Sequence, residues 1–185
     1  MAIFLALAAI AATGGSVPRP PVIRDGCQGE WCSDMGTWIV RAPVELYAKP
    51  NSSRPIATLR KGTRLKALGG IVITTRVGTG VLTQPYEDHD SNGRLTVQVA
   101  KGTRIYILSG IAEGSVVART LDERELTVDD SEYEATSECI AHDWVRVRLP
   151  NGRIGWVEHD DDADFDCSSV FDDQERCEAL GAGPG

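Results

Sequence analysis

Residues 61–71, KGTRLKALGGI, return forty positions later as KGTRIYILSGI at residues 101–111. Seven of the eleven positions are identical between the two copies. Each copy starts with a polar Lys-Gly-Thr-Arg turn and continues into an apolar run of strand-forming residues. Repetition at a fixed spacing is typical of chains built from similar units. The sequence therefore predicts an all-β protein containing two related β units, which suits a binding module better than an enzyme.

The overall charge argues against one class of partner. The chain has 185 residues and a net charge of −8, which allows one or two domains. Nucleic-acid binding needs a basic face, so no nucleic-acid partner is expected. Ten carboxylates lie between Glu158 and Glu178 against a single base, Arg176. Such a run is typical of a solvated acidic tail, predicted here for residues 159–185.

The first residues indicate export. Residues 2–12 form an apolar run that is too short to span a bilayer and is followed by small and polar residues. This pattern predicts a signal peptide over residues 1–12, and hence a periplasmic or secreted protein. The usual basic start is missing, which leaves two alternatives: a start codon inside a longer signal, or an uncleaved anchor. No later segment is apolar enough for a transmembrane span.

Five cysteines fit an oxidising compartment. Cys27 with Cys32 and Cys167 with Cys177 could close two local disulfide loops, which would leave Cys139 unpaired. A bridge between Cys139 and Cys167 is an alternative, and the spacing does not choose between them.

The last predicted hairpin has the clearest pattern. Residues 144–149, WVRVRL, alternate with period two, so that Val145 and Val147 share one face while Trp144, Arg146 and Arg148 share the other. Asn151-Gly152 then supplies a tight turn, and residues 154–157, IGWV, form the returning strand. By contrast, the acidic residues 119–138 are expected to form an insertion or a long loop, with at most one strand or helical turn inside residues 121–128.

Two of these segments resemble a known family. Residues 46–50, LYAKP, with the following Lys-Gly turn at residues 61–62, resemble the opening of bacterial SH3-like domains, and residues 144–157, WVRVRLPNGRIGWV, resemble their closing hairpin. The chain is similar to an uncharacterised group of exported bacterial SH3-domain proteins. The resemblance implies a small SH3-like β-barrel together with a second, inserted or incomplete SH3-like unit.

The spacing of the repeats shapes the expected organisation, because forty residues are too few for a complete barrel between the two turns. We expect a linker with cysteines at residues 13–36 and the opening of a first unit at 37–79. A second unit or insertion with an acidic loop would follow at 80–138. The closing hairpin would occupy residues 139–158.

The same resemblance implies a non-enzymatic module that binds cell-wall peptides or protein partners. Aromatic side chains give such a groove contact area at a low cost in entropy. The candidate ligand-binding residues are Tyr47, Tyr86, Trp144 and Trp156. Packing inside the β units is the alternative role for these side chains.

Metal-dependent chemistry is the alternative function, and a disulfide-stapled structural spacer is another. Residues 88–93, DHDSNG, match the start of a calcium loop, but Val99 stands where a bidentate glutamate is expected. The acidic tail offers a second place for calcium. Cys27, Cys32, Cys139 and His142 have a spacing that could hold zinc, and Cys139 with His142 could form a nucleophile and its base. We expect no cofactor, no bound metal and no catalytic residues.

Overall fold

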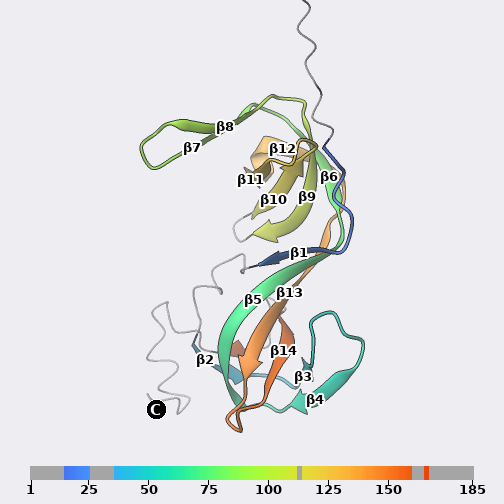
Figure 1. Ribbon diagram of the computed structural model, residues 1–185, viewed down its shortest axis with the longest axis vertical. Coiled ribbons are helices and arrows are strands. Elements are labelled where there is room, and N and C mark those ends of the chain that lie inside the picture. Colours follow the sequence, from blue (N-terminus) through green and yellow to red (C-terminus); the bar gives the residue numbers. More distant parts are fainter. Residues whose placement is uncertain (1–14, 26–35, 112–113, 160–164, 167–185) are drawn as a thin grey trace, which may run out of the picture.

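The computed structural model describes residues 15–25, 36–111, 114–159 and 165–166, and they form an all-β structure (Figure 1). The predicted fold class is therefore confirmed at this level. A short 3₁₀ turn, η3, spans Asp130–Glu132. None of the described residues forms a helix that is long and apolar enough to cross a membrane. The predicted signal peptide lies outside the described residues.

An eight-stranded antiparallel sheet, here called the first unit, occupies the lower half of Figure 1. Its strands follow the order β15-β2-β5-β13-β14-β3-β4, and β1 pairs with β5 beside this path. The bounds of these strands are β1 Val22–Asp25, β2 Thr37–Val40, β3 Val44–Tyr47, β4 Pro55–Leu59, β5 Arg64–Arg76, β13 Ile140–Arg148, β14 Ile154–His159 and β15 Phe165–Asp166.

The chain between β5 and β13 forms the second unit, in the upper half of Figure 1. It contains a five-stranded sheet in the order β11-β10-β9-β6-β12 and a separate hairpin of β7 with β8. Its strands are β6 Gly78–Leu82, β7 Tyr86–His89, β8 Leu95–Val99, β9 Arg104–Ile111, β10 Ser115–Thr120, β11 Glu125–Asp129 and β12 Tyr133–Ser137. None of the three sheets closes into a barrel through the pairings of the described strands.

The strand registers relate the two units position by position. Ile39 of β2 lies opposite Arg64 of β5, as Val81 of β6 lies opposite Arg104 of β9. The two Lys-Gly turns make the same hydrogen bonds: the Gly62 amide donates to Val40 O and the Gly102 amide to Leu82 O, both at 2.8 Å. The other equivalent strands are β3 and β7, β4 and β8, β13 and β10, β14 and β11, and β15 and β12.

The closing turns of the two units are also equivalent. In the first unit the Leu149 amide donates to Arg153 O at 2.8 Å, and Gly152 has a φ of 83°. In the second unit the Thr120 amide donates to Arg124 O at 2.9 Å, with Glu123 at a φ of 68° in the glycine position. The repeated Lys-Gly-Thr-Arg segment is thus the visible part of a repeat that extends over both whole units.

Each unit has its own apolar core, because alternate residues of its strands point inward. The first core is built from the buried residues Trp38, Val40, Val44, Leu46, Leu59, Leu65, Ala67, Val145, Val147 and Val157. The second core contains Leu82, Val99, Ile105, Ile107, Val116, Ala118, Leu126 and Val128. The two units contact each other at β5, where the buried hydroxyl of Thr74 donates a 2.5 Å hydrogen bond to Leu108 O on β9.

The expectation of a long loop over residues 119–138 is wrong. These residues contain the end of β10, all of β11 and β12, and the 3₁₀ turn between them. The acidic side chains mask a strand pattern, since Leu126 and Val128 are buried while their neighbours Glu125, Thr127 and Asp129 are exposed. Charge on the outer face of an antiparallel sheet is fully compatible with pairing.

Candidate functional site

Three of the four aromatic candidates lie together on the outer face of the first unit. Trp156 of β14 is directly opposite Tyr47 of β3, and Trp144 of β13 lies on the same face. The Tyr47 and Trp144 rings meet edge to face, with centroids 5.3 Å apart and an interplanar angle of 79°. This is a favourable geometry for an aromatic pair. We call Tyr47, Trp144 and Trp156 the aromatic face.

The three rings differ in how much of each is accessible. Tyr47 and Trp156 are half-buried, whereas Trp144 is only 3% exposed and packs against the Tyr47 ring. The indole Nε1 of Trp144 is buried and has no hydrogen-bond acceptor among the described residues. A buried donor without a partner costs about 1–3 kcal/mol.

One end of the aromatic face is acidic. The Tyr47 hydroxyl donates a short hydrogen bond to Glu45 Oε2, and Glu158 lies opposite Trp144 in the β13–β14 register. The bond to Glu45, desolvation and the negative charges of Glu45 and Glu158 together raise the pKa of Tyr47 to about 12. His142 Nδ1 lies 2.7 Å from Glu158 Oε1. Tyr47 is therefore a neutral hydrogen-bonding group at physiological pH.

The other end of the aromatic face is basic. Arg146 is exposed and lies directly opposite Trp156 in the β13–β14 pair. The aromatic rings thus lie between a cation and a pair of carboxylates. The acidic end was not predicted from the sequence, although the hairpin turn at Asn151-Gly152 fixes the register that puts Glu158 opposite Trp144.

The fourth candidate, Tyr86, lies elsewhere. It begins β7 in the second unit, is half-buried and packs against the second core. Burial is the main cause that raises the pKa of its hydroxyl. Its register partner is Val99, just as Val44 faces Leu59 in the first unit. Tyr86 therefore occupies a core-facing position rather than a place on the aromatic face.

The calcium-like motif forms the tip of the β7–β8 hairpin. Asp90 Oδ1 accepts hydrogen bonds from the amides of Asn92 and Arg94, both at 2.9 Å. That carboxylate closes its own turn. Among the described residues, no group of three or more His, Cys, Asp or Glu side chains could hold a metal ion.

Cys139 is a free thiol, half-buried against the core of the second unit. Desolvation raises its pKa, which keeps it protonated and a weak nucleophile. His142, its suggested partner, is engaged with Glu158 on the first unit. The predicted disulfide cysteines Cys27, Cys32, Cys167 and Cys177 lie outside the described residues, as do most of the acidic tail residues.

Comparison with known proteins adds no relative to this picture. The sequence matches no protein-family model, and a search of curated proteins finds no match either.

Proposed function

We propose that this chain is an exported, non-enzymatic binding protein with two SH3-like units. Its aromatic face would bind a cell-envelope peptide, of the kind found in peptidoglycan, or a protein partner. The observation that carries the proposal is the convergence of Tyr47, Trp144 and Trp156, which come from three different strands, on one outer face.

The shared plan of the two units supports the SH3-like interpretation. Each unit has a first strand, a hairpin, a Lys-Gly turn, a long strand and a closing hairpin, in that order. In each unit the last strand returns beside the first: β15 pairs with β2, and β12 with β6. The second unit lies in the chain between the long strand and the closing hairpin of the first.

The composition of the aromatic face suits a peptide. Tyr47 and Trp156 offer flat surfaces with few rotatable bonds, so that little side-chain entropy is lost on binding. Arg146 at one end and Glu158 at the other would fix the direction of a ligand that carries both a carboxylate and an amine.

Export is the part of the proposal that rests on sequence alone. The apolar residues 2–12 followed by small residues favour a secretory signal, and five cysteines are compatible with an oxidising compartment. Fusion of residues 1–36 to a reporter enzyme that works only outside the cytoplasm tests this part. A reporter that stays silent would remove the envelope ligand from the proposal.

Binding is tested with the full chain and purified peptidoglycan in a pull-down, and with soluble peptidoglycan peptides by calorimetry. We expect Trp156→Ala and Tyr47→Ala to weaken binding about tenfold or more, as loss of an aromatic anchor usually does. The controls are the equivalent residues of the second unit, Thr127→Ala and His89→Ala, which should leave binding unchanged. Equal behaviour of the two pairs of variants would refute the aromatic face as the site.

A further inference from the structure

A second feature of the first unit is a cationic hollow near its closing turn. It has a volume of about 320 Å³ and is lined by Thr37, Arg64, Leu65, Lys66, Arg148, Leu149 and Pro150. Three of the seven lining residues are basic and none is acidic, in a chain whose net charge is −8. Leu65 is 2% exposed, so the hollow reaches down to the edge of the apolar core.

The two cations at its centre face each other. Lys66 of β5 lies directly opposite Arg148 of β13 in the sheet register. Like charges in directly opposite positions destabilise a strand pair. Both side chains are exposed, and neither makes an ion pair with any residue that the structure describes. The sheet therefore carries a local repulsion that nothing in the described part of the molecule relieves.

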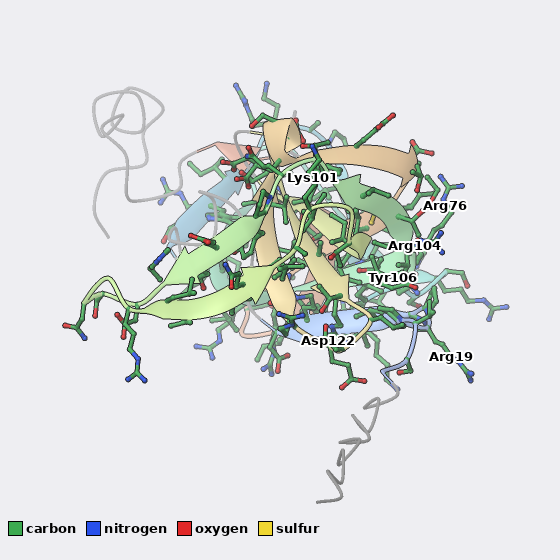
Figure 2. All side chains as sticks on the ribbon, turned by 90° about the horizontal axis from the view of Figure 1, so that it is seen from above. Arg19, Arg76, Lys101, Arg104, Tyr106 and Asp122 are labelled. Atoms are coloured by element: carbon green, nitrogen blue, oxygen red, sulfur yellow. The ribbon has the colours of Figure 1, made fainter. Side chains whose placement is uncertain are left out.

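The second unit has a hollow at the equivalent place, with a different charge pattern. It measures about 480 Å³ and is lined by Thr103, Arg104, Tyr106, Thr120, Leu121, Asp122 and Arg124. Figure 2 labels three of these residues, Arg104, Tyr106 and Asp122. Tyr106 occupies the position of Lys66, which removes one of the two opposed cations.

Acidic residues of the second unit lie beside two of its cations. Asp122 Oδ2 lies 2.7 Å from Arg124. Glu125 pairs with Arg24 at 2.5 Å and also lies 3.9 Å from Arg119, the residue equivalent to Arg148. The position equivalent to Glu125 in the first unit is Ile154, which is directly opposite Arg148. In the first unit, by contrast, Lys66 and Arg148 have no carboxylate partner among the described residues.

We propose that the cationic hollow of the first unit binds an organic anion, a carboxylate or phosphate group carried on an apolar stem. Arg148 can present parallel N–H donors to the oxyanion, and Lys66 adds a point charge beside it. Leu65, Leu149 and Pro150 give the stem an apolar wall. Binding of an anion also removes the repulsion between Lys66 and Arg148. This site is separate from the aromatic face.

The test uses the full-length protein labelled with ¹⁵N and follows amide chemical shifts during titration. The probes are acetyl-dialanine, which ends in a carboxylate, its neutral C-terminal amide, and inorganic phosphate. We expect acetyl-dialanine to shift the amides of Lys66 and Arg148 and to leave those of Tyr106 and Arg119 unmoved. The neutral amide should shift neither pair. Phosphate distinguishes the two possible anionic groups. If phosphate binds more tightly than acetyl-dialanine, the ligand carries a phosphate group; if it binds more weakly, the ligand carries a carboxylate on an apolar stem.

Ile154→Glu introduces the carboxylate that Glu125 provides at the equivalent position of the second unit, and it removes no cation. It should weaken anion binding about tenfold, because a carboxylate a few ångströms from Arg148 competes for it. Ile154→Gln, which matches it in size and is neutral, should bind as the unaltered protein does. Ile154 is 39% exposed, so both variants should fold. Arg148→Gln should also abolish the shifts, whereas Arg146→Gln should not.

Three results would overturn the site: equal shifts at the two hollows, equal affinity of the Glu and Gln variants, or no shift at Lys66 with either anion. Failure of the aromatic face is recognised separately, because Trp156→Ala should leave acetyl-dialanine binding at Lys66 and Arg148 intact.

Discussion

The two units share their strand plan but use their first hairpins differently. In the first unit, β3 pairs with β14, so the β3–β4 hairpin is part of the main sheet. In the second unit the β7–β8 hairpin is a separate two-stranded sheet, which projects to the left in Figure 1. Only the first unit therefore has an outer face that extends continuously from the hairpin to the closing strands.

This difference follows from the position of one buried leucine, which lies on the hairpin in the first unit and on the closing strand in the second. In the first unit Leu46 is fully buried over Gly155, where an added Cβ would lie 2.7 Å from Leu46 Cδ1. In the second unit the equivalent positions hold Asp88, which is exposed, and Leu126, which is 1% exposed. The leucine comes from the hairpin in one unit and from the closing strand in the other.

The position of this leucine has a functional consequence. Because Leu46 anchors the hairpin to the sheet, its neighbour Tyr47 lies against Trp144 and opposite Trp156. In the second unit His89, Ser115 and Thr127 occupy the three equivalent positions. Two units with the same strand plan therefore present different outer surfaces.

The largest effect should come from removing this anchor. Leu46→Ala should lower the free energy of unfolding by about 2–5 kcal/mol, the usual range for a fully buried leucine. Asp88→Ala, the equivalent change in the second unit, should alter stability by about 0.5 kcal/mol at most, as is usual for exposed positions. Urea unfolding followed by tryptophan fluorescence measures both. Similar losses for the two variants would mean that the hairpins are anchored in the same way.

The ionisation of Tyr47 distinguishes the two units, because the equivalent residue of the second unit is a histidine, His89. Glu45→Gln should lower the pKa of Tyr47 from about 12 toward the ordinary value, because it removes the carboxylate that accepts the hydroxyl proton. The control is Glu87→Gln, the equivalent change in the second unit. Ultraviolet absorbance of the phenolate during alkaline titration measures the shift. A titration that is identical in both variants would contradict the assignment.

The raised pKa also predicts how stability varies with pH. An unfolded tyrosine titrates near pH 10, about two pH units below Tyr47 in the folded chain. Its contribution to stability is therefore fully present below pH 10 and is lost as the pH rises from 10 through 12. In Glu45→Gln this alkaline loss should shrink.

Substitutions in the two Lys-Gly turns should have equal effects on stability, because the turns have the same conformation in both units. Gly62 and Gly102 both have a φ of 82°, and an added Cβ at either would meet no atom within 4 Å. Alanine at either position should cost about 1–2 kcal/mol, from backbone strain alone. Chemical denaturation of the two single variants and the double variant measures this. Unequal or strongly non-additive losses of unfolding free energy would indicate that one turn makes stabilising interactions that the other lacks.

Much of the strand pattern could be predicted from sequence. The repeated Lys-Gly-Thr-Arg segment marks two real, equivalent turns, and the alternation of Val145 and Val147 identifies the inward face of the closing hairpin. These features are local, and short-range patterns record local geometry well. The full extent of the repeat was not visible, because outside residues 61–71 and 101–111 most equivalent positions share apolar character alone, as at Val40 and Leu82.

The candidate site was only partly predictable, for a related reason. Tyr47 and Trp156 are far apart in sequence, and nothing local records that β3 lies beside β14. The sequence around Tyr86 does not distinguish it from an exposed aromatic residue. Only its pairing with Val99 in the β7–β8 register identifies it as a core position. The cationic hollow depends on two residues on different strands, Lys66 and Arg148, that face each other across 82 positions of chain.

The smallest predicted effect compares the two closing turns. Glu123 has a φ of 68°, a left-handed conformation that side chains other than glycine and asparagine rarely adopt, while Gly152 takes the same role in the first unit without strain. Glu123→Gly should therefore stabilise the protein by about 0.5–1 kcal/mol, since the relief of strain exceeds the added flexibility of the unfolded chain. Gly152→Glu should destabilise by a similar amount. Thermal and urea unfolding measure both changes, with Glu123→Ala as the control that keeps the strain. A destabilised Glu123→Gly would mean that the glutamate side chain holds the turn through its contacts, and the equivalence of the two closing turns would then end at their backbone hydrogen bonds.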